Sequence, residues 1–163
     1  MRAAVSPIRG SVVVRLAPRP AFDLFTVGMD RWWPLDSYSR AVSELAPEKV
    51  EAVRLDLQPG LGGSIIEHLD DGRTLPWGVI AEWRPPDRVV IEWKPHSLPE
   101  PPTEVDVTFT GHDRGTLVEV EHRGWDRLSE GFCDALRPVY ERGWPPTLAR
   151  YVAAAGQDAA PES

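Results

Sequence analysis

The spacing of the apolar residues changes near Gly124, and this change limits the fold more than any other feature of the sequence. Before Gly124, several segments carry an apolar residue at every second position, as strands with one buried face do. After Gly124 the apolar residues recur every four positions, a series that only a helix places on one face. The sequence therefore predicts an α+β fold in which a sheet precedes a long C-terminal helix. The helical series consists of Phe132, Leu136, Tyr140, Trp144 and Leu148.

Two short helices are expected directly after the first strand. Residues 11–16 alternate between apolar and polar side chains and predict that strand. Pro18 and Pro20 then stop a strand and suit the first turn of a helix. We expect this helix over residues 20–27, and a second short helical turn over residues 29–33.

Six further alternating segments follow, separated by glycine-rich or proline-rich turns. Together with the first strand they predict a seven-stranded, bent antiparallel sheet around the C-terminal helix. In the segment that begins at Trp77, alternation places Trp77, Val79, Ala81 and Trp83 on one face. The six segments span residues 50–57, 64–69, 77–83, 89–93, 104–110 and 116–122.

Three prolines lie within the predicted C-terminal helix, Pro138 and the pair Pro145-Pro146. Proline lacks an amide hydrogen and disfavours helical geometry at the preceding residue. We therefore expect a kink near Gly143-Trp144, with Pro145 restarting the helix.

Length and composition favour a single globular domain. The chain has 163 residues, 42% of them apolar, and no linker-like interior stretch, so we expect one domain over residues 8–155 and a flexible tail over residues 156–163. The net charge is −7 and the basic residues are scattered, which argues against nucleic acid as a partner. Cys133 is the single cysteine, and no segment has the character of a signal peptide or a membrane span. We therefore expect a cytoplasmic protein without a membrane partner.

Four local motifs, taken with this order of elements, resemble the START-like helix-grip superfamily. Within it, the chain resembles the family related to the C-terminal domain of the activator of the Hsp90 ATPase. The motifs are Arg31-Trp32-Trp33-Pro34, Gly62-Gly63, Trp77-Gly78 leading to Glu82-Trp83-Arg84-Pro85-Pro86, and His122-Arg123-Gly124-Trp125 preceding Tyr140 to Trp144.

The resemblance implies that a concave sheet grips the C-terminal helix and leaves an elongated apolar pocket between them. Such pockets are used for lipids, hormones or aromatic polyketides. The chain has no room for the additional N-terminal domain with which the eukaryotic activator contacts the chaperone, so an Hsp90-type partner is not expected. A homodimer is left open.

The predicted binding residues are aromatic side chains and one histidine that face the expected pocket. A small apolar molecule would enter between the Trp32-Trp33 segment, the proline-rich loop over residues 95–102 and the C-terminal helix. Indole suits such walls because it offers a large apolar face and one donor. The predicted set is Trp32, Trp33, Trp77, Trp83, Trp93, Phe109, His122, Phe132, Tyr140 and Trp144.

His122 admits two interpretations, because alternation places it among inward apolar residues. It could orient a polar group of a ligand, or it could be a core histidine whose ring nitrogens are satisfied within the protein. The four histidines lie on different elements without a metal-ligand spacing, so neither a metal nor another cofactor is predicted. No nucleophile motif is present, so no catalytic residue is assigned.

Three carboxylic acids within the predicted strands, Glu67, Glu82 and Glu92, are expected to point outward. One that turned inward could instead serve as an acid or base.

Three functions are compatible with these patterns, and the second and third are what the resemblance implies. The first is binding of a small apolar or aromatic molecule without a reaction. The second is an enzyme of the aromatase or cyclase kind, which an inward acid and base pair would favour. The third is a chaperone-linked interaction domain, which predicts a filled interior and an exposed apolar patch in place of a cavity.

Overall fold

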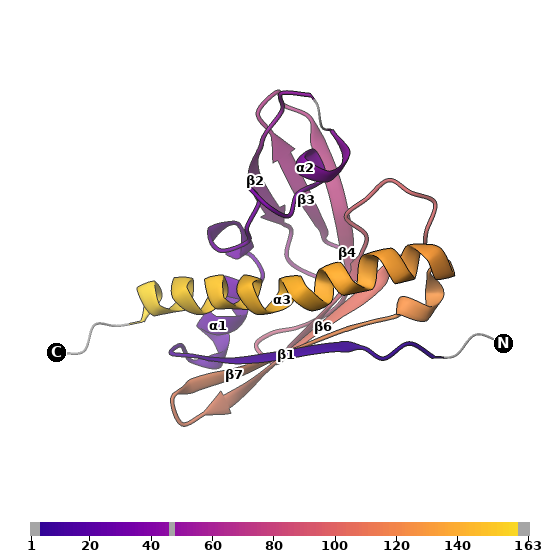
Figure 1. Cartoon of the computed structure of the whole chain (residues 1–163). Coiled ribbons are helices and arrows are strands. Elements are labelled where there is room, and N and C mark those ends of the chain that lie inside the picture. Colours follow the sequence, from indigo (N-terminus) through magenta and orange to yellow (C-terminus); the bar gives the residue numbers. More distant parts are fainter. Residues whose placement is uncertain (1–3, 46–47, 160–163) are drawn as a thin grey trace.

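A long C-terminal helix lies across a curled antiparallel sheet (Figure 1). The computed structural model describes residues 4–45 and 48–159. Within them, seven strands form one sheet in the order β1-β7-β6-β5-β4-β3-β2. Each strand from β2 to β6 pairs with the next along the chain, whereas β1 pairs with β7. The predicted seven-stranded α+β fold is confirmed.

The strands are β1 (Ile8–Val14), β2 (Ala52–Leu57), β3 (Ser64–Leu69), β4 (Thr74–Arg84), β5 (Arg88–Trp93), β6 (Thr103–His112) and β7 (Gly115–Arg123). The helices are α1 (Pro18–Phe25), α2 (Arg40–Glu44) and α3 (Glu130–Asp158), with single 3-10 turns at Met29–Arg31 and Trp125–Arg127.

The segment from β1 to β2 carries the chain from one edge of the sheet to the other. Helix α1 begins at Pro18, two residues before the predicted start, because its two prolines occupy the first turn, where no amide hydrogen is needed. Helix α2 was not predicted. Its five residues begin after Ser39, whose hydroxyl oxygen accepts a hydrogen bond from the Val42 N–H at 3.0 Å.

Strand β4 breaks the predicted alternation at two places. Its pairing with β3 skips Trp77, and its pairing with β5 skips Ala81. Each extra residue changes which face the following side chains occupy. Val79 is therefore 41% exposed and Ile80 only 1%, so the prediction that Val79 and Ala81 share one face with Trp77 is wrong. An irregular pairing at the start of β2 likewise leaves Val53 exposed.

Helix α3 runs unbroken through its three prolines, so the expected restart at Pro145 is wrong. Pro145 and Pro146 are exposed, as are the residues four positions earlier, whose carbonyls lose their helical partners. These carbonyls can bond to water instead. The helix also includes Gly156 to Asp158, where we expected the tail to begin, and Asp158 accepts two hydrogen bonds from Arg31 at 2.6 and 2.7 Å. The last four residues of the predicted tail lie outside the described residues.

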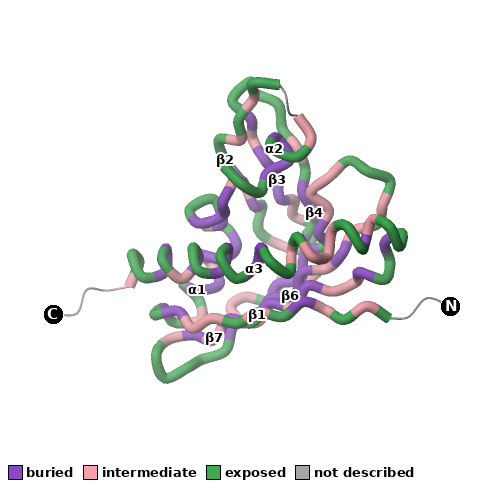
Figure 2. The backbone as a smooth tube through the Cα atoms, viewed as in Figure 1, coloured by how far each residue is buried: buried purple, intermediate pink, exposed green. Residues whose placement is uncertain are grey.

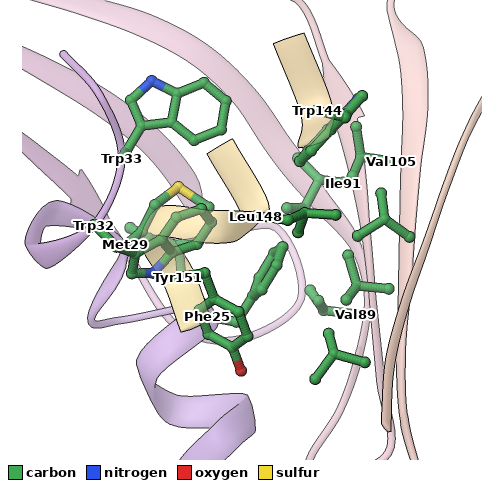
Figure 3. Packing of buried hydrophobic residues seen from close by; sticks show 14 of the residues in the cluster. Phe25, Met29, Trp32, Trp33, Val89, Ile91, Val105, Trp144, Leu148 and Tyr151 are labelled. Atoms are coloured by element: carbon green, nitrogen blue, oxygen red, sulfur yellow. The ribbon is translucent and has the colours of Figure 1, made fainter. Parts of the chain in front are cut away.

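The C-terminal half of α3 is packed tightly into the concave face (Figures 2 and 3). Tyr151 is fully buried, and its hydroxyl donates to the Ala21 carbonyl of α1 at 2.7 Å. Its ring meets Phe25 and Trp32 at centroid distances of 5.2 and 5.1 Å. The N-terminal half differs, because Phe132, Leu136 and Tyr140 are only partly buried. The core is thus filled at one end of the helix and less so at the other.

Glu67 of β3 is fully buried, contrary to the outward position that we predicted. Both of its carboxyl oxygens accept hydrogen bonds: Oε1 from the Arg40 N–H at 2.7 Å and the Trp77 indole N–H at 2.9 Å, and Oε2 from the Ala41 N–H at 2.9 Å. Two of these donors belong to the first turn of α2, which has no internal partners for them. Glu67 therefore fastens α2 to the sheet.

We expect Glu67→Gln to lower the free energy of unfolding by about 1–3 kcal/mol, because an amide nitrogen would replace one acceptor among three buried donors. Urea denaturation followed by circular dichroism measures the change. Glu92→Gln is the matched control, since Glu92 is exposed on β5 and should change stability by less than about 0.5 kcal/mol. Equal effects of the two substitutions would contradict the anchoring role.

Candidate functional site

A cavity of about 670 Å³ lies where the core is less filled, beside the N-terminal half of α3. Its other walls come from the segment between Trp33 and Glu44, from Trp77 of β4, and from the start of the loop between β5 and β6. The face that α3 contributes consists of Phe132, Leu136, Val139, Tyr140, Gly143, Trp144 and Thr147.

Three tryptophans give this cavity flat apolar walls. The indole N–H of Trp33 donates to the Tyr38 carbonyl at 2.8 Å, and that of Trp144 donates to Nδ1 of His122 at 3.1 Å. The third, Trp77, donates to Glu67. Since each indole nitrogen is bonded within the protein, these residues offer a ligand their ring faces and no free donor.

Hydrogen bonds join the two sides of the cavity mouth. Glu44, the last residue of α2, accepts from the Ser97 N–H at 2.8 Å and the Ser97 hydroxyl at 3.0 Å, and it also pairs with Arg40 at 2.5 Å. Burial alone would raise the pKa of Glu44, but the bonds from Arg40 and Ser97 hold it below its ordinary value. The rim beyond them is apolar, with Leu98 and Val139 48% and 41% exposed.

His122 of β7 lies behind the cavity wall, with no exposed surface. Its Nδ1 accepts from the indole of Trp144, so in the neutral ring the hydrogen is on Nε2, which lies 2.8 Å from the Thr103 hydroxyl. Thr103 in turn donates to the Trp93 carbonyl at 3.3 Å. Burial lowers the pKa of His122 to about 3, so the ring stays neutral near pH 7. The geometry favours the satisfied core histidine over the ligand-orienting one.

Tyr140 lines the cavity from α3 and carries a hydroxyl group. Its hydroxyl oxygen accepts from the Trp93 indole N–H at 2.9 Å. Burial raises the pKa of Tyr140 to about 12, although the bond from Trp93 acts in the opposite direction. The hydroxyl therefore keeps its hydrogen at physiological pH.

The structure divides the ten predicted site residues into two groups of five. The group that lines the cavity consists of Trp33, Trp77, Phe132, Tyr140 and Trp144. The others do not line it: Trp93 and His122 support it from behind, while Trp32, Trp83 and Phe109 pack at the filled end of the core against Phe22 or Phe25.

The predicted site did not include the wall between Ser37 and Glu44, or the helix residues Leu136, Val139, Gly143 and Thr147. Thr147 follows Tyr140 by seven positions and Trp144 by three, so helical periodicity could have found it. The α2 wall carried no such signal, because its position depends on the distant Glu67.

Two negative findings hold for residues 4–45 and 48–159. No three His, Cys, Asp or Glu side chains in these ranges gather closely enough to hold a metal ion. No helix there is long and apolar enough to cross a membrane.

Neutral His122 should make stability fall in mild acid. Its folded-state pKa lies below the ordinary 6.5, so the unfolded chain takes up the proton first as the pH falls. The contribution is complete above about pH 6.5 and is lost progressively as the pH falls toward 3. Between pH 7 and pH 5, wild-type protein should lose about 2 kcal/mol more stability than His122→Gln, measured by urea unfolding at each pH.

The exposed His112 provides the control, since His112→Gln should keep the wild-type pH dependence. Nuclear magnetic resonance gives an independent measurement on the unmodified protein. A native His122 imidazole that titrates near pH 6.5 would contradict the assignment.

Comparison with known proteins gives one family match and several similar structures. The family model for Activator of Hsp90 ATPase homolog 1-like protein matches residues 18–150. No curated protein matches the chain. One similar solved structure is an anthrahydroquino-gamma-pyrone synthase, Txn09, determined as a complex, with 29% identity, a TM-score of 0.61, and coverage of 94% of this chain and 99% of that one.

Two further structures share the fold at lower identity. The self-sacrificing resistance protein CalC from Micromonospora echinospora is 24% identical, with a TM-score of 0.65 and coverage of 96% and 98% of the two chains. The Aha1 dimer from Colwellia psychrerythraea is 14% identical, with a TM-score of 0.61 and coverage of 93% and 96%. With the family match spanning most of the sequence and the helix-grip fold in place, the chain belongs to the family of Activator of Hsp90 ATPase homolog 1-like proteins.

Proposed function

We propose that the protein binds a flat, multi-ring aromatic small molecule in the cavity beside α3. The observation that carries this proposal is the wall of three tryptophans whose indole donors are all bonded within the protein. Such a wall offers ring faces for stacking and little to bind a strongly polar molecule. Most of the remaining surface is apolar, and α3 contributes Phe132, Leu136 and Val139 to it.

The size of the cavity suits this ligand class. At about 670 Å³ it lies within the range of about 300–1,000 Å³ that small-molecule sites occupy. Each 100 Å² of apolar ligand surface removed from water would contribute about 2.5 kcal/mol before the entropic losses of binding. The apolar rim at Leu98 and Val139 leaves the mouth accessible to such a molecule.

Similarity to the anthrahydroquino-gamma-pyrone synthase supports an aromatic ligand over an aliphatic one. That protein is 29% identical across 94% of this chain, and its name describes a fused-ring product. The same similarity favours a second candidate, an enzyme that folds or closes a reactive aromatic precursor. His122 offers no support for the enzyme, because its two ring nitrogens are engaged by Trp144 and Thr103.

The cavity argues against the chaperone-linked role, which predicts a filled interior. Similarity to the Aha1 dimer is at 14% identity and bears on the fold alone. A homodimer and a cytoplasmic location remain predictions.

We expect Leu136→Trp to fill the cavity and weaken binding of the three-ring probe 9-fluorenone at least about tenfold, because the new indole would occupy space that the ligand needs. Isothermal titration calorimetry measures the dissociation constant. The control is Leu61→Trp, at a turn position that is 76% exposed, and it should bind as wild type does.

Native mass spectrometry and organic extraction of the purified protein complement this measurement. An aromatic molecule that co-purifies with wild-type protein and is absent from Leu136→Trp would identify the ligand class. Equal binding by both proteins would place the probe elsewhere and refute the proposal. Conversion of an extracted aromatic precursor on incubation with wild-type protein would favour the enzyme.

A further inference from the structure

The polar groups of the cavity wall are largely engaged within the protein. The oxygen of Ser39 accepts from the Val42 N–H, and the hydroxyl of Ser43 donates to the Ser39 carbonyl at 3.1 Å. Glu44 is bonded to Arg40 and Ser97 at the mouth. These groups hold α2 in place. The Ser39 hydroxyl still has its hydrogen to donate, whereas Ser43 and Glu44 have little capacity left for a ligand.

Two hydroxyls on α3 are less fully used. Thr147 is only 3% exposed and lines the cavity, and no hydrogen bond of its side chain is found within the described residues. It can both donate and accept, so it imposes no direction on a ligand. Tyr140, two helical turns earlier, accepts from Trp93, and no acceptor for its own hydrogen is found in the same part of the chain.

The hydrogen bond from Trp93 makes the Tyr140 hydroxyl a donor toward a ligand. A phenolic oxygen that already accepts a hydrogen bond from an N–H can still donate its own hydrogen. The matching group on the ligand is therefore a hydrogen-bond acceptor. A donor that itself accepts a hydrogen bond is also strengthened by polarisation. The raised pKa of Tyr140 ensures that the hydrogen is present across the physiological range.

The support for this donor is rigid. Trp93 lies on β5, and its carbonyl accepts from Thr103, which His122 contacts in turn. The ring of His122 meets that of Tyr140 edge to face at 4.8 Å. Thr103 and His122 lie on the next two strands, β6 and β7, so three adjacent strands fix the orientation of the hydroxyl before any ligand arrives.

We propose that Tyr140 is the specificity-determining residue of the cavity, and that the ligand is a flat aromatic ketone or quinone whose carbonyl oxygen accepts a hydrogen bond from the Tyr140 hydroxyl. This inference rests on the proposed binding function and adds the polar group that the ligand must carry. The carbonyl would lie against the middle of α3, with the rings between the tryptophan walls.

A matched pair of probes tests the inference. Fluorene and 9-fluorenone share one three-ring skeleton and differ only in a methylene or a carbonyl group. Tyr140→Phe should weaken 9-fluorenone about five- to tenfold and leave fluorene within about twofold, since one neutral hydrogen bond is lost. Calorimetric dissociation constants for both probes, with wild-type protein and variants of verified thermal stability, give the comparison.

The outcomes separate this inference from the binding function. An equal loss for both probes would mean that Tyr140 acts through packing alone, which overturns the inference. A loss for 9-fluorenone in Thr147→Val and not in Tyr140→Phe would assign the carbonyl to Thr147 and also overturn it. If both probes bind with equal affinity and neither Tyr140→Phe nor Thr147→Val changes the dissociation constants, the binding function stands, and the inference that Tyr140 selects a carbonyl group is wrong. If neither probe binds wild-type protein, both proposals fail.

Discussion

The neutral imidazole of His122 is the interaction on which the cavity depends most. It accepts from Trp144 of α3 and contacts Thr103 of β6, so one buried ring joins the helix to the sheet at the level of the cavity. A charged imidazole could not accept from Trp144, which is why the depressed pKa matters to structure as well as to stability. Trp93 extends the same network to Tyr140. The helix is thereby held at a fixed distance from the strands without apolar side chains filling the space between.

Glu67 performs a corresponding task on the opposite wall. Its carboxyl group satisfies the first turn of α2, a helix too short to be stable by itself. It also bonds to Trp77, so the same side chain fixes a helix and a cavity wall. Glu44 then ties the far end of α2 to Ser97. Both walls are therefore held by buried polar side chains, and the aromatic residues supply the surface between them.

The sequence predicts the order of elements well, because periodicity records which face of a strand or helix is buried. It fails where a strand contains one extra residue that no glycine or proline signals, as at Trp77 and Ala81 of β4. Beyond each extra residue, the side chains that would face the core face solvent instead, and the reverse. The buried Glu67 could not be recognised either, since its partners Arg40 and Ala41 are distant in sequence. Three prolines did not interrupt α3, and the exposure of Pro145 and Pro146 is a tertiary property that local propensity does not contain.

The candidate site shows the same limit in another form. Alternation correctly assigns Phe109 and Trp93 to the concave face, but that face is filled near α1 and open near α2. Whether an inward aromatic residue packs in the core or lines the cavity depends on its position along the axis of α3. Periodicity carries no information on that position. What keeps the open end from closing is the bonding of each indole, because an inward shift of Trp33, Trp77 or Trp144 would leave buried polar groups unsatisfied, at about 1–3 kcal/mol each. The polar network thus maintains a preformed apolar space, which reduces the reorganisation that a ligand would otherwise require.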